Sequence, residues 1–106
     1  FVETNKPIDL ESVVKTFRDF KSEPQKLELP SAPKSPILVR EEQDRPQPRM
    51  DREVNKGMGV VIGRVRKERV FENGFKYVVA GHNHIRGTSG NTLLCAELLY
   101  KKGLVK

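Results

Sequence analysis

The sequence predicts an α+β fold in which helices cover a mixed, largely antiparallel sheet. Three observations lead to this class. An amphipathic helical pattern lies near the N-terminus, a strand with a hairpin signal occupies the second half, and a mostly apolar helical pattern lies near the C-terminus. With 106 residues the chain is one domain at most and buries roughly 65% of the surface of its unfolded state.

The charge of the chain is uneven. Residues 1–54 carry ten Lys/Arg and eleven Asp/Glu, whereas residues 55–106 carry ten and three, so the halves are −1 and +7. The basic half predicts contact with an anion or with an acidic surface. The single cysteine cannot form an intrachain disulfide, and no apolar run is long enough to cross a bilayer, which favours a cytoplasmic protein without a membrane partner. Because the chain begins with Phe1, we expect it to be part of a longer protein.

The first predicted elements are a strand and a helix. Residues 1–4 are strand-like, and the helix begins after Asp9, its expected N-cap, with Glu11 in the first turn. Apolar residues recur at helical spacing and predict a stripe that covers a sheet. These residues are Leu10, Val13, Val14 and Phe17.

Four prolines interrupt residues 21–36 and predict an extended connection without a helix. It is either a disordered linker or an ordered arm on the domain surface. The ordered arm is favoured because Leu27 and Leu29 alternate with charged residues. A short strand is then predicted from Pro36 to Arg40.

The stretch DRPQPRMDR, residues 44–52, is dense in charge, and its two prolines predict an extended backbone. Arg45, Arg49 and Arg52 have two interpretations. Their guanidinium groups can grip a carboxylate or phosphate through paired hydrogen bonds, or they can form structural ion pairs with nearby acids such as Asp51. The structural pairing is favoured, and the anion site stays open.

The central strand is predicted over residues 58–66, where a continuous apolar run gives way to alternation with arginine. This change indicates burial on both faces followed by one solvated face. Asn73-Gly74 predicts a two-residue type I′ turn, because both central residues of that turn need a positive φ. Residues 75–80 are then expected to return antiparallel to the central strand.

A helix is predicted over residues 90–102. It is apolar around most of its circumference, which is typical of a helix that is buried or lies at an interface. Gly103 suits the left-handed position that ends a helix. Cys95, flanked by apolar neighbours, is predicted to be a core residue and not an accessible nucleophile.

The segment GHNHIRGTSGN, residues 81–91, gathers the chemically active side chains. We expect the strand to stop at His82 and the last helix to begin near Thr88 or Ser89. Such a helix start presents backbone N–H groups that favour anions and polar ligand atoms.

A simpler interpretation of the same segment is that nothing binds there. Gly87 and Gly90 are then only turn and cap residues, and His82 and His84 are surface histidines. The two histidines have no further metal ligand at a suitable spacing, so no metal site is predicted.

Three stretches are distinctive when taken together: DRPQPRMDR at 44–52, GMGVVIGRVR at 57–66 and GHNHIRGTSGNTLLCAELL at 81–99. In their order and spacing they resemble the C-terminal part of aspartate-semialdehyde dehydrogenase of the archaeal and fungal type. The resemblance implies that residues 1–106 are the C-terminal portion of the catalytic and dimerisation domain of an oxidoreductase that forms homodimers or homotetramers. The implied reaction uses NADPH to convert L-4-aspartyl phosphate to L-aspartate 4-semialdehyde and phosphate, in the branch leading to lysine, threonine and methionine.

The resemblance also implies a cofactor contact at Asn83 and Gly87. In the family the asparagine lies beside the nicotinamide of NADP, where its amide can bond the carboxamide, and the glycine allows close backbone approach. This sequence departs from the family by Thr88-Ser89 in place of two alanines and by His84 in place of threonine.

No catalytic residue is assigned in this chain. The family places its nucleophilic cysteine and its acid/base histidine before the position where this chain starts, and it carries an ordinary helix residue at the position of Cys95. The isolated chain is therefore predicted to be inactive.

Three alternatives accompany this assignment. Malonyl-CoA reductase, of the same superfamily, has a similar C-terminal region, but the intact Gln47-Pro48-Arg49 favours the aspartate enzyme. A structural oligomerisation fragment without activity of its own is the second. A nucleic-acid-binding module is the third, but residues 64–69 lack interleaved aromatics and no recognition motif is present, so no nucleic-acid partner is expected.

Overall fold

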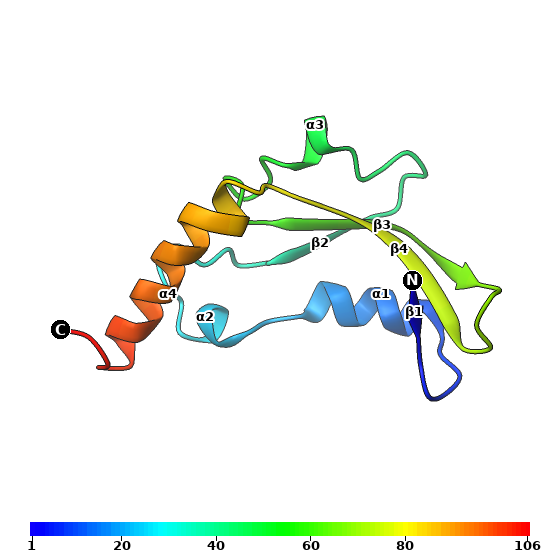
Figure 1. Ribbon diagram of the computed structural model, residues 1–106, viewed down its shortest axis with the longest axis horizontal. Helices are drawn as coiled ribbons and strands as arrows, with labels where there is room; N and C mark the ends of the chain where they lie inside the picture. Colours follow the sequence, from blue (N-terminus) through cyan, green and yellow to red (C-terminus); the bar gives the residue numbers. More distant parts are fainter.

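A computed structural model describes residues 1–106 and confirms the α+β class with a mixed, largely antiparallel sheet (Figure 1). The strand order is β1-β4-β3-β2, in which β2 and β3 are parallel and the other neighbours are antiparallel. The strands are β1 (Val2–Glu3), β2 (Ile37–Arg40), β3 (Val60–Glu68) and β4 (Gly74–Gly81). The helical elements are α1 (Leu10–Asp19), α2 (Glu23–Lys26), α3 (Pro48–Asp51), η1 (Ile85–Ser89) and α4 (Gly90–Lys101).

Helix α1 covers one face of the sheet, against β2 and β3 (Figure 1). Asp9 is its N-cap, as predicted, and accepts a hydrogen bond from the backbone N of Ser12 at 3.0 Å. Val13 is buried, and the ring of Phe17 meets the ring of Tyr77 edge to face at 5.3 Å between centroids. The apolar stripe predicted from the sequence therefore packs on the sheet.

Strand β3 is buried on both faces at its start, where Val61 and Ile62 are 0% and 4% exposed. A bulge follows, with a φ of 52° at Arg64 and a register shift between Gly63 and Arg66. Beyond the bulge Arg66 is exposed. The predicted change from two buried faces to one solvated face is confirmed.

The β3–β4 hairpin is present, but the predicted two-residue type I′ turn is wrong. Gly74 pairs with Glu68 across the sheet, so the loop spans residues 69–73, and neither Asn73 nor Gly74 has a positive φ. The Glu68 carboxylate accepts hydrogen bonds from the next two backbone N–H groups at 2.7 and 3.2 Å. A carboxylate at the end of the strand therefore organises the loop in place of the Asn-Gly pair.

Residues 21–36 form an ordered arm, which confirms that interpretation. The expectation that this stretch holds no helix is wrong, because it contains α2. Pro24 lies in the first turn of α2, where no backbone N–H is needed. The side-chain oxygen of Gln25 accepts hydrogen bonds from the backbone N and the hydroxyl of Ser22, at 3.0 and 2.7 Å.

Helix α4 extends away from the sheet and packs on this arm (Figure 1). Its one buried residue, Leu94, clusters with Leu29 of the arm and with Met58. The Glu97 carboxylate accepts hydrogen bonds from the backbone N and the hydroxyl of Ser31, at 3.0 and 2.7 Å. These contacts give α4 a small core of its own, separate from the sheet.

Leu98 is half-buried against this cluster, but the other apolar side chains of α4 are exposed, and Cys95 is exposed with them, so its predicted core position is wrong. Cys95 follows the buried Leu94 by one position, which rotates it about 100° away from the arm. Leu93 and Tyr100 are 55% and 69% exposed. Gly103, with a φ of 69°, ends the helix as predicted.

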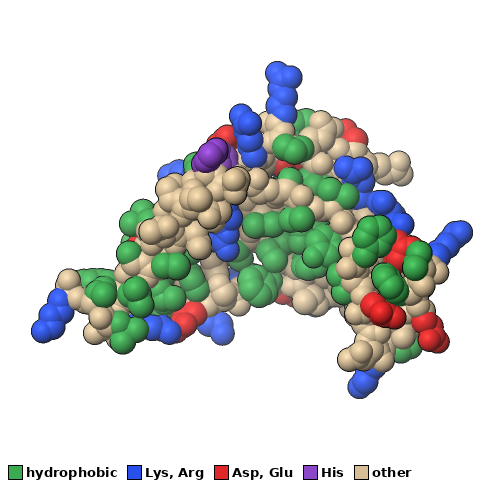
Figure 2. All heavy atoms as spheres, in the orientation of Figure 1, with side chains coloured by type: hydrophobic (Ala, Val, Ile, Leu, Met, Phe, Trp, Pro, Cys, Tyr) green, Lys and Arg blue, Asp and Glu red, His purple; other side chains and the backbone are tan.

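The chain is more extended than a compact domain of its length. Its radius of gyration is 15.8 Å, whereas about 13 Å is expected for a compact fold of this size. Sixteen of its 106 residues are buried. Figure 2 shows hydrophobic side chains along α4 and in the hollow between α4 and the far end of the sheet. None of the helices has the length and apolar character needed to cross a membrane.

Candidate functional site

The segment between β4 and α4 forms a π-helical turn, η1. The backbone N–H groups of Gly87 and Ser89 donate to carbonyls five residues earlier, those of His82 and His84, each at 3.2 Å. This spacing defines a π-helix, and such turns are rare and often occur at functional sites. The π-helical turn therefore indicates a functional site in this segment, independently of the sequence motifs.

The last helix, α4, begins at Gly90 with Ser89 as its N-cap, close to the start predicted at Thr88 or Ser89, and the π-helical turn η1 precedes it from Ile85. Gly90, considered above as a cap, lies within the helical path with a φ of −66°. The hydroxyls of Thr88 and Ser89 both donate to the carbonyl of His84, the serine at 2.8 Å. Thr88 and Ser89 thus stabilise the turn.

Asn83 and Gly87, the two residues expected to contact a cofactor, lie together in this turn. A β-carbon added at Gly87 would stand 2.8 Å from Oδ1 of Asn83 and 3.7 Å from its Cγ, so the amide of Asn83 covers the glycine. Asn83 is exposed, and the hydrogen bond that reaches it, from Thr88, goes to its backbone carbonyl at 3.4 Å. Its amide is therefore available to a ligand.

His82 contacts the start of the turn through its side chain. Its Nδ1 accepts a hydrogen bond from the backbone N of Ile85 at 3.3 Å, and the side chain is 19% exposed. Its Nε2 lies 3.6 Å from a Glu53 carboxylate oxygen, beyond hydrogen-bond range. The sequence marked His82 only as a strand end. The N-cap of the turn, His84, makes no side-chain cap bond, so the ring of His82, two residues earlier, supplies the acceptor for the first helical N–H.

Arg86 adds an unpaired cation to the same turn. One of its guanidinium nitrogens, Nη1, is buried and has no hydrogen-bond partner in the chain. Buried polar groups normally have partners. An acceptor from a ligand or from another part of the assembly would satisfy this nitrogen. No group of three or more His, Cys, Asp and Glu side chains lies close enough to hold a metal ion.

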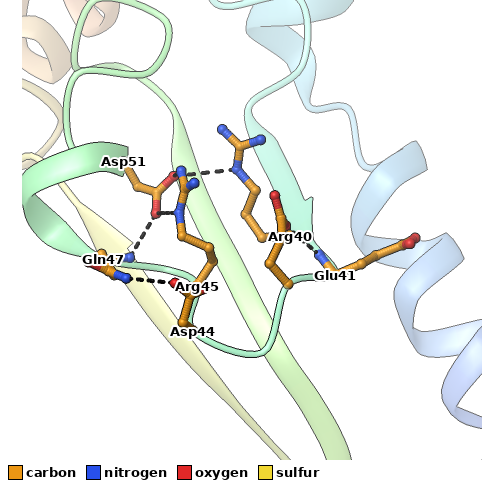
Figure 3. Close-up of polar contacts among 7 residues, drawn as sticks. Arg40, Glu41, Asp44, Arg45, Gln47 and Asp51 are labelled. Carbon is orange, nitrogen blue, oxygen red and sulfur yellow. Dashed lines mark hydrogen bonds and ion pairs between the residues drawn. The ribbon is translucent and has the colours of Figure 1, made fainter.

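A second polar cluster surrounds Asp51, which is fully buried (Figure 3). Its carboxylate accepts hydrogen bonds from Nε and Nη2 of Arg45, the first at 2.8 Å, from the backbone N of Gln47 at 2.7 Å and from Nε of Arg40 at 3.3 Å. The bonds from Arg45 are the main cause that lowers the pKa of Asp51 from 3.8 to about 2, against the opposing effect of burial.

The extended backbone predicted for residues 44–52 is wrong, because Pro48 occupies the first turn of α3. Arg45 is structural, since it pairs with a buried carboxylate. Arg52 pairs with the neighbouring glutamate at 3.2 Å on the surface. Arg49 is exposed and forms no ion pair within the chain.

A groove adjoins the Asp51 cluster at Arg40, lies between α1 and the ends of β2 and β3, and has a volume of about 1080 Å³. Both signs of charge line it, and Arg18 and Glu41 form an ion pair there. A lining of mixed charge favours no single class of charged ligand. Arg64 and Arg66, at the basic end of β3, share this groove with acidic residues. The cationic lining residues are Lys15, Arg18, Arg40, Arg64 and Arg66.

Residues 1–86 match the family described as semialdehyde dehydrogenase, dimerisation domain. The chain belongs to this family. The match covers the whole sheet and ends inside η1, so Gly87 and α4 follow the matched part. The matched part thus includes Asn83, which follows the last strand, β4.

Three relatives extend this assignment. The aspartate-semialdehyde dehydrogenase of Methanothermobacter thermautotrophicus is 46% identical over 93% of this chain and 28% of its own length. The crystal structure of aspartate semialdehyde dehydrogenase with NADP from Candida albicans has a TM-score of 0.84 and 36% identity, over 96% of this chain and 28% of that one. The malonyl CoA reductase (NADP) of Metallosphaera sedula is 38% identical over 99% of this chain and 29% of its own length. The chain therefore spans less than a third of each relative.

Proposed function

We propose that residues 1–106 are the C-terminal portion of the catalytic and dimerisation domain of an NADPH-dependent aspartate-semialdehyde dehydrogenase. The proposed reaction is the reductive dephosphorylation of L-4-aspartyl phosphate to L-aspartate 4-semialdehyde, a step toward lysine, threonine and methionine. The name of the archaeal relative supports the substrate, and the NADP in the Candida albicans structure supports the cofactor.

The observation that carries the cofactor role is the placement of Asn83. Its amide lies against Gly87 in a π-helical turn, and the chain's own hydrogen bond to this residue uses only the backbone carbonyl. A nicotinamide carboxamide has one acceptor and two donor positions, and an asparagine amide complements both kinds. Asn83 thus fits one end of the cofactor. NADPH supplies the hydride when bound, and this chain's residues orient it.

Gly87 contributes by leaving room for Asn83. A β-carbon at Gly87 would stand 2.8 Å from the amide oxygen of Asn83 and would displace it. The glycine therefore makes room for the asparagine side chain and also allows a ligand to approach the backbone. The buried Nη1 of Arg86 offers a further donor on the same turn. Together these groups make the turn a polar binding edge.

The catalytic nucleophile and the acid/base residue belong, in this proposal, to the part of the enzyme outside this chain. Cys95 is exposed on α4, but the residues one turn away, Asn91 and Leu99, are uncharged and cannot activate a thiol. The isolated chain is therefore expected to have no dehydrogenase activity. Turnover of aspartate semialdehyde by residues 1–106 alone would refute this expectation.

An assay of the complete enzyme tests the substrate. NADP, phosphate and aspartate semialdehyde should give NADPH, whereas malonyl-CoA with NADPH should not be turned over. The reverse preference would favour malonyl-CoA reductase, the second candidate, which the 38% identity to the Metallosphaera sedula enzyme supports. The intact Gln47-Pro48-Arg49 argues for the aspartate enzyme.

The Asn83→Ala variant of the complete enzyme tests the cofactor role. We expect the KM for NADPH to rise about tenfold, which corresponds to the loss of one or two hydrogen bonds, with a smaller change in kcat. Asn91→Ala, a matched change at an exposed site on α4, should leave the KM unchanged. Equal KM values for both variants and the parent enzyme would leave the turn with only a structural role.

The proposed enzyme is a homo-oligomer, a dimer or tetramer, and cytoplasmic. The family description supports association, and so do the exposed apolar residues of α4, which need a cover in water. A purely structural oligomerisation fragment would use the same surface, and the Asn83→Ala measurement separates the two roles.

A further inference from the structure

We propose that His82 is a positioning residue for the cofactor-binding turn, through the hydrogen bond that its Nδ1 accepts from the backbone N–H of Ile85. The inference rests on the proposed function, since it concerns the segment assigned to the cofactor. His82 acts through Asn83 and is not itself a contact of the cofactor or the substrate.

Two backbone N–H groups that follow Asn83 in the chain are hydrogen-bonded to His82. The side chain of His82 bonds forward to Ile85 at 3.3 Å, and its carbonyl accepts the N–H of Gly87 at 3.2 Å. The first N–H of a helical segment has no partner within the helix, and here the His82 ring supplies an acceptor. His82 thus accepts two hydrogen bonds, donated by Ile85 and Gly87, and Asn83 lies in the chain between His82 and both donors.

The ring of His82 has few other constraints. Its Nε2 is 3.6 Å from Glu53, whose side chain is 63% exposed, and such surface pairs contribute little. The ring of His84 lies 6.3 Å away, and His84 is exposed. Because Nδ1 accepts a hydrogen bond, the neutral ring carries its proton on Nε2. The bond to Ile85 is thus the main directional contact of the side chain.

Loss of this bond should loosen the turn without unfolding the domain. The buried contacts of the sheet and of Leu94 do not involve His82. Asn83 would then have to be ordered when the cofactor binds, and this cost appears as weaker binding. The loss of one hydrogen bond of average strength predicts a loss of about fivefold in affinity.

Three substitutions in the complete enzyme isolate the bond. Asn places an acceptor oxygen the same number of bonds from Cα as Nδ1, whereas Gln places it one bond farther, at the position of Nε2. We expect His82→Gln and His82→Ala to raise the Kd for NADPH about fivefold, and His82→Asn to stay within about twofold of the parent enzyme. His84→Asn is the matched control and should leave the Kd unchanged.

If Asn83→Ala weakens NADPH binding, two outcomes would overturn the inference: equal loss of affinity in His82→Asn and His82→Gln, or no loss in His82→Gln. Thermal unfolding of each variant separates a loosened turn from a misfolded protein. If His82→Ala fails to fold, the comparison of Asn with Gln decides alone.

Amide hydrogen exchange at Ile85 keeps the inference distinct from the proposed function. Faster exchange in His82→Gln than in His82→Asn supports the positioning role even if Asn83→Ala leaves the Kd for NADPH unchanged, in which case only the cofactor assignment fails. Equal exchange in the parent enzyme and both variants contradicts the positioning role.

Discussion

Asp51 is the residue on which the segment between β2 and β3 depends. Its side chain is fully buried, and its carboxylate accepts four hydrogen bonds. Three of these come from the guanidinium groups of Arg40 and Arg45. A buried charge is tolerable only when it is paired and hydrogen-bonded. Asp51 meets this condition, so its removal should cost more than that of a surface acid.

We expect Asp51→Asn to lower the free energy of unfolding by about 3 kcal/mol, because it leaves the guanidinium of Arg45 without its counter-charge. The matched control is Asp44→Asn. Asp44 is exposed and accepts one bond, from Gln47 at 3.1 Å, so its change should stay within about 0.5 kcal/mol. Urea unfolding of the complete enzyme measures both values, and equal costs would contradict the account of Asp51.

The same carboxylate predicts a pH dependence. Its pKa in the folded state is about 2, below the ordinary 3.8, so the unfolded state binds more protons between these values. The stabilisation is therefore complete above 3.8 and is lost as the pH falls toward 2. The difference in stability between the parent enzyme and Asp51→Asn should narrow over this window. A constant difference there would mean that the charge of Asp51 is not the source.

Gly87→Ala tests whether the position of the Asn83 side chain against Gly87 matters for NADPH binding. The added β-carbon would displace the asparagine amide, which lies 2.8 Å from its position, while the helical backbone accepts alanine. NADPH binding should weaken several-fold, and the thermal unfolding midpoint should change little. Unchanged binding would show that Asn83 can move without consequence for the cofactor.

At single positions the sequence predicts groups with a local cause and misses those whose partners come from elsewhere. The Asp9 cap was predictable because its partner, Ser12, is three residues away. The role of Arg45 stayed open until the fold placed it on Asp51. The contact between Asn83 and Gly87 needed the π-helical path, which no residue pattern announces.

Among the elements, α4 is the least buried for its composition. Leu94 is 5% exposed within the cluster with Met58, whereas the adjacent Leu93 is 55% exposed. The family match ends before this helix begins, and its exposed side chains face away from the arm. The surface of α4 thus has the character of an interface.

A pair of adjacent leucines tests this view. In the isolated chain Leu94→Ala should lower the free energy of unfolding by about 2–4 kcal/mol through lost burial and a cavity, and Leu93→Ala should stay within about 0.5 kcal/mol. In the complete enzyme Leu93→Ala should become costly as well, because another part of the assembly covers it. Denaturant unfolding of both proteins makes the comparison. A neutral Leu93→Ala in the complete enzyme would mean that this face stays in water.

Helices and strands were predicted correctly where the spacing of apolar residues determined them. The predictions were wrong where they rested on proline or on the Asn-Gly pair alone. The spacing of α1 and the apolar run of β3 predicted both elements. Pro24 and Pro48 indicated extended chain, yet each lies in the first turn of a short helix, where the missing N–H costs nothing. In the hairpin, the Glu68 carboxylate outweighed the Asn-Gly preference.

For the whole molecule, the open shape and the family membership agree. The radius of gyration is 15.8 Å, and the chain spans less than a third of each relative. Both observations fit the proposal that residues 1–106 are one portion of a larger enzyme. Fold class was predictable because it follows from hydrophobic patterning. The cofactor and the substrate were predicted from the resemblance to a family and not from patterning, since the turn supplies only one polar edge of such a site.

A crystal structure of the complete enzyme with bound NADP tests whether Asn83 contacts the nicotinamide. We expect the Asn83 amide to lie within hydrogen-bond distance of the nicotinamide carboxamide, about 2.7–3.2 Å, with Gly87 beneath the asparagine side chain. A nicotinamide bound elsewhere, with the amide of Asn83 facing solvent or another subunit, would contradict the claim and reduce the turn to a structural connection between β4 and α4.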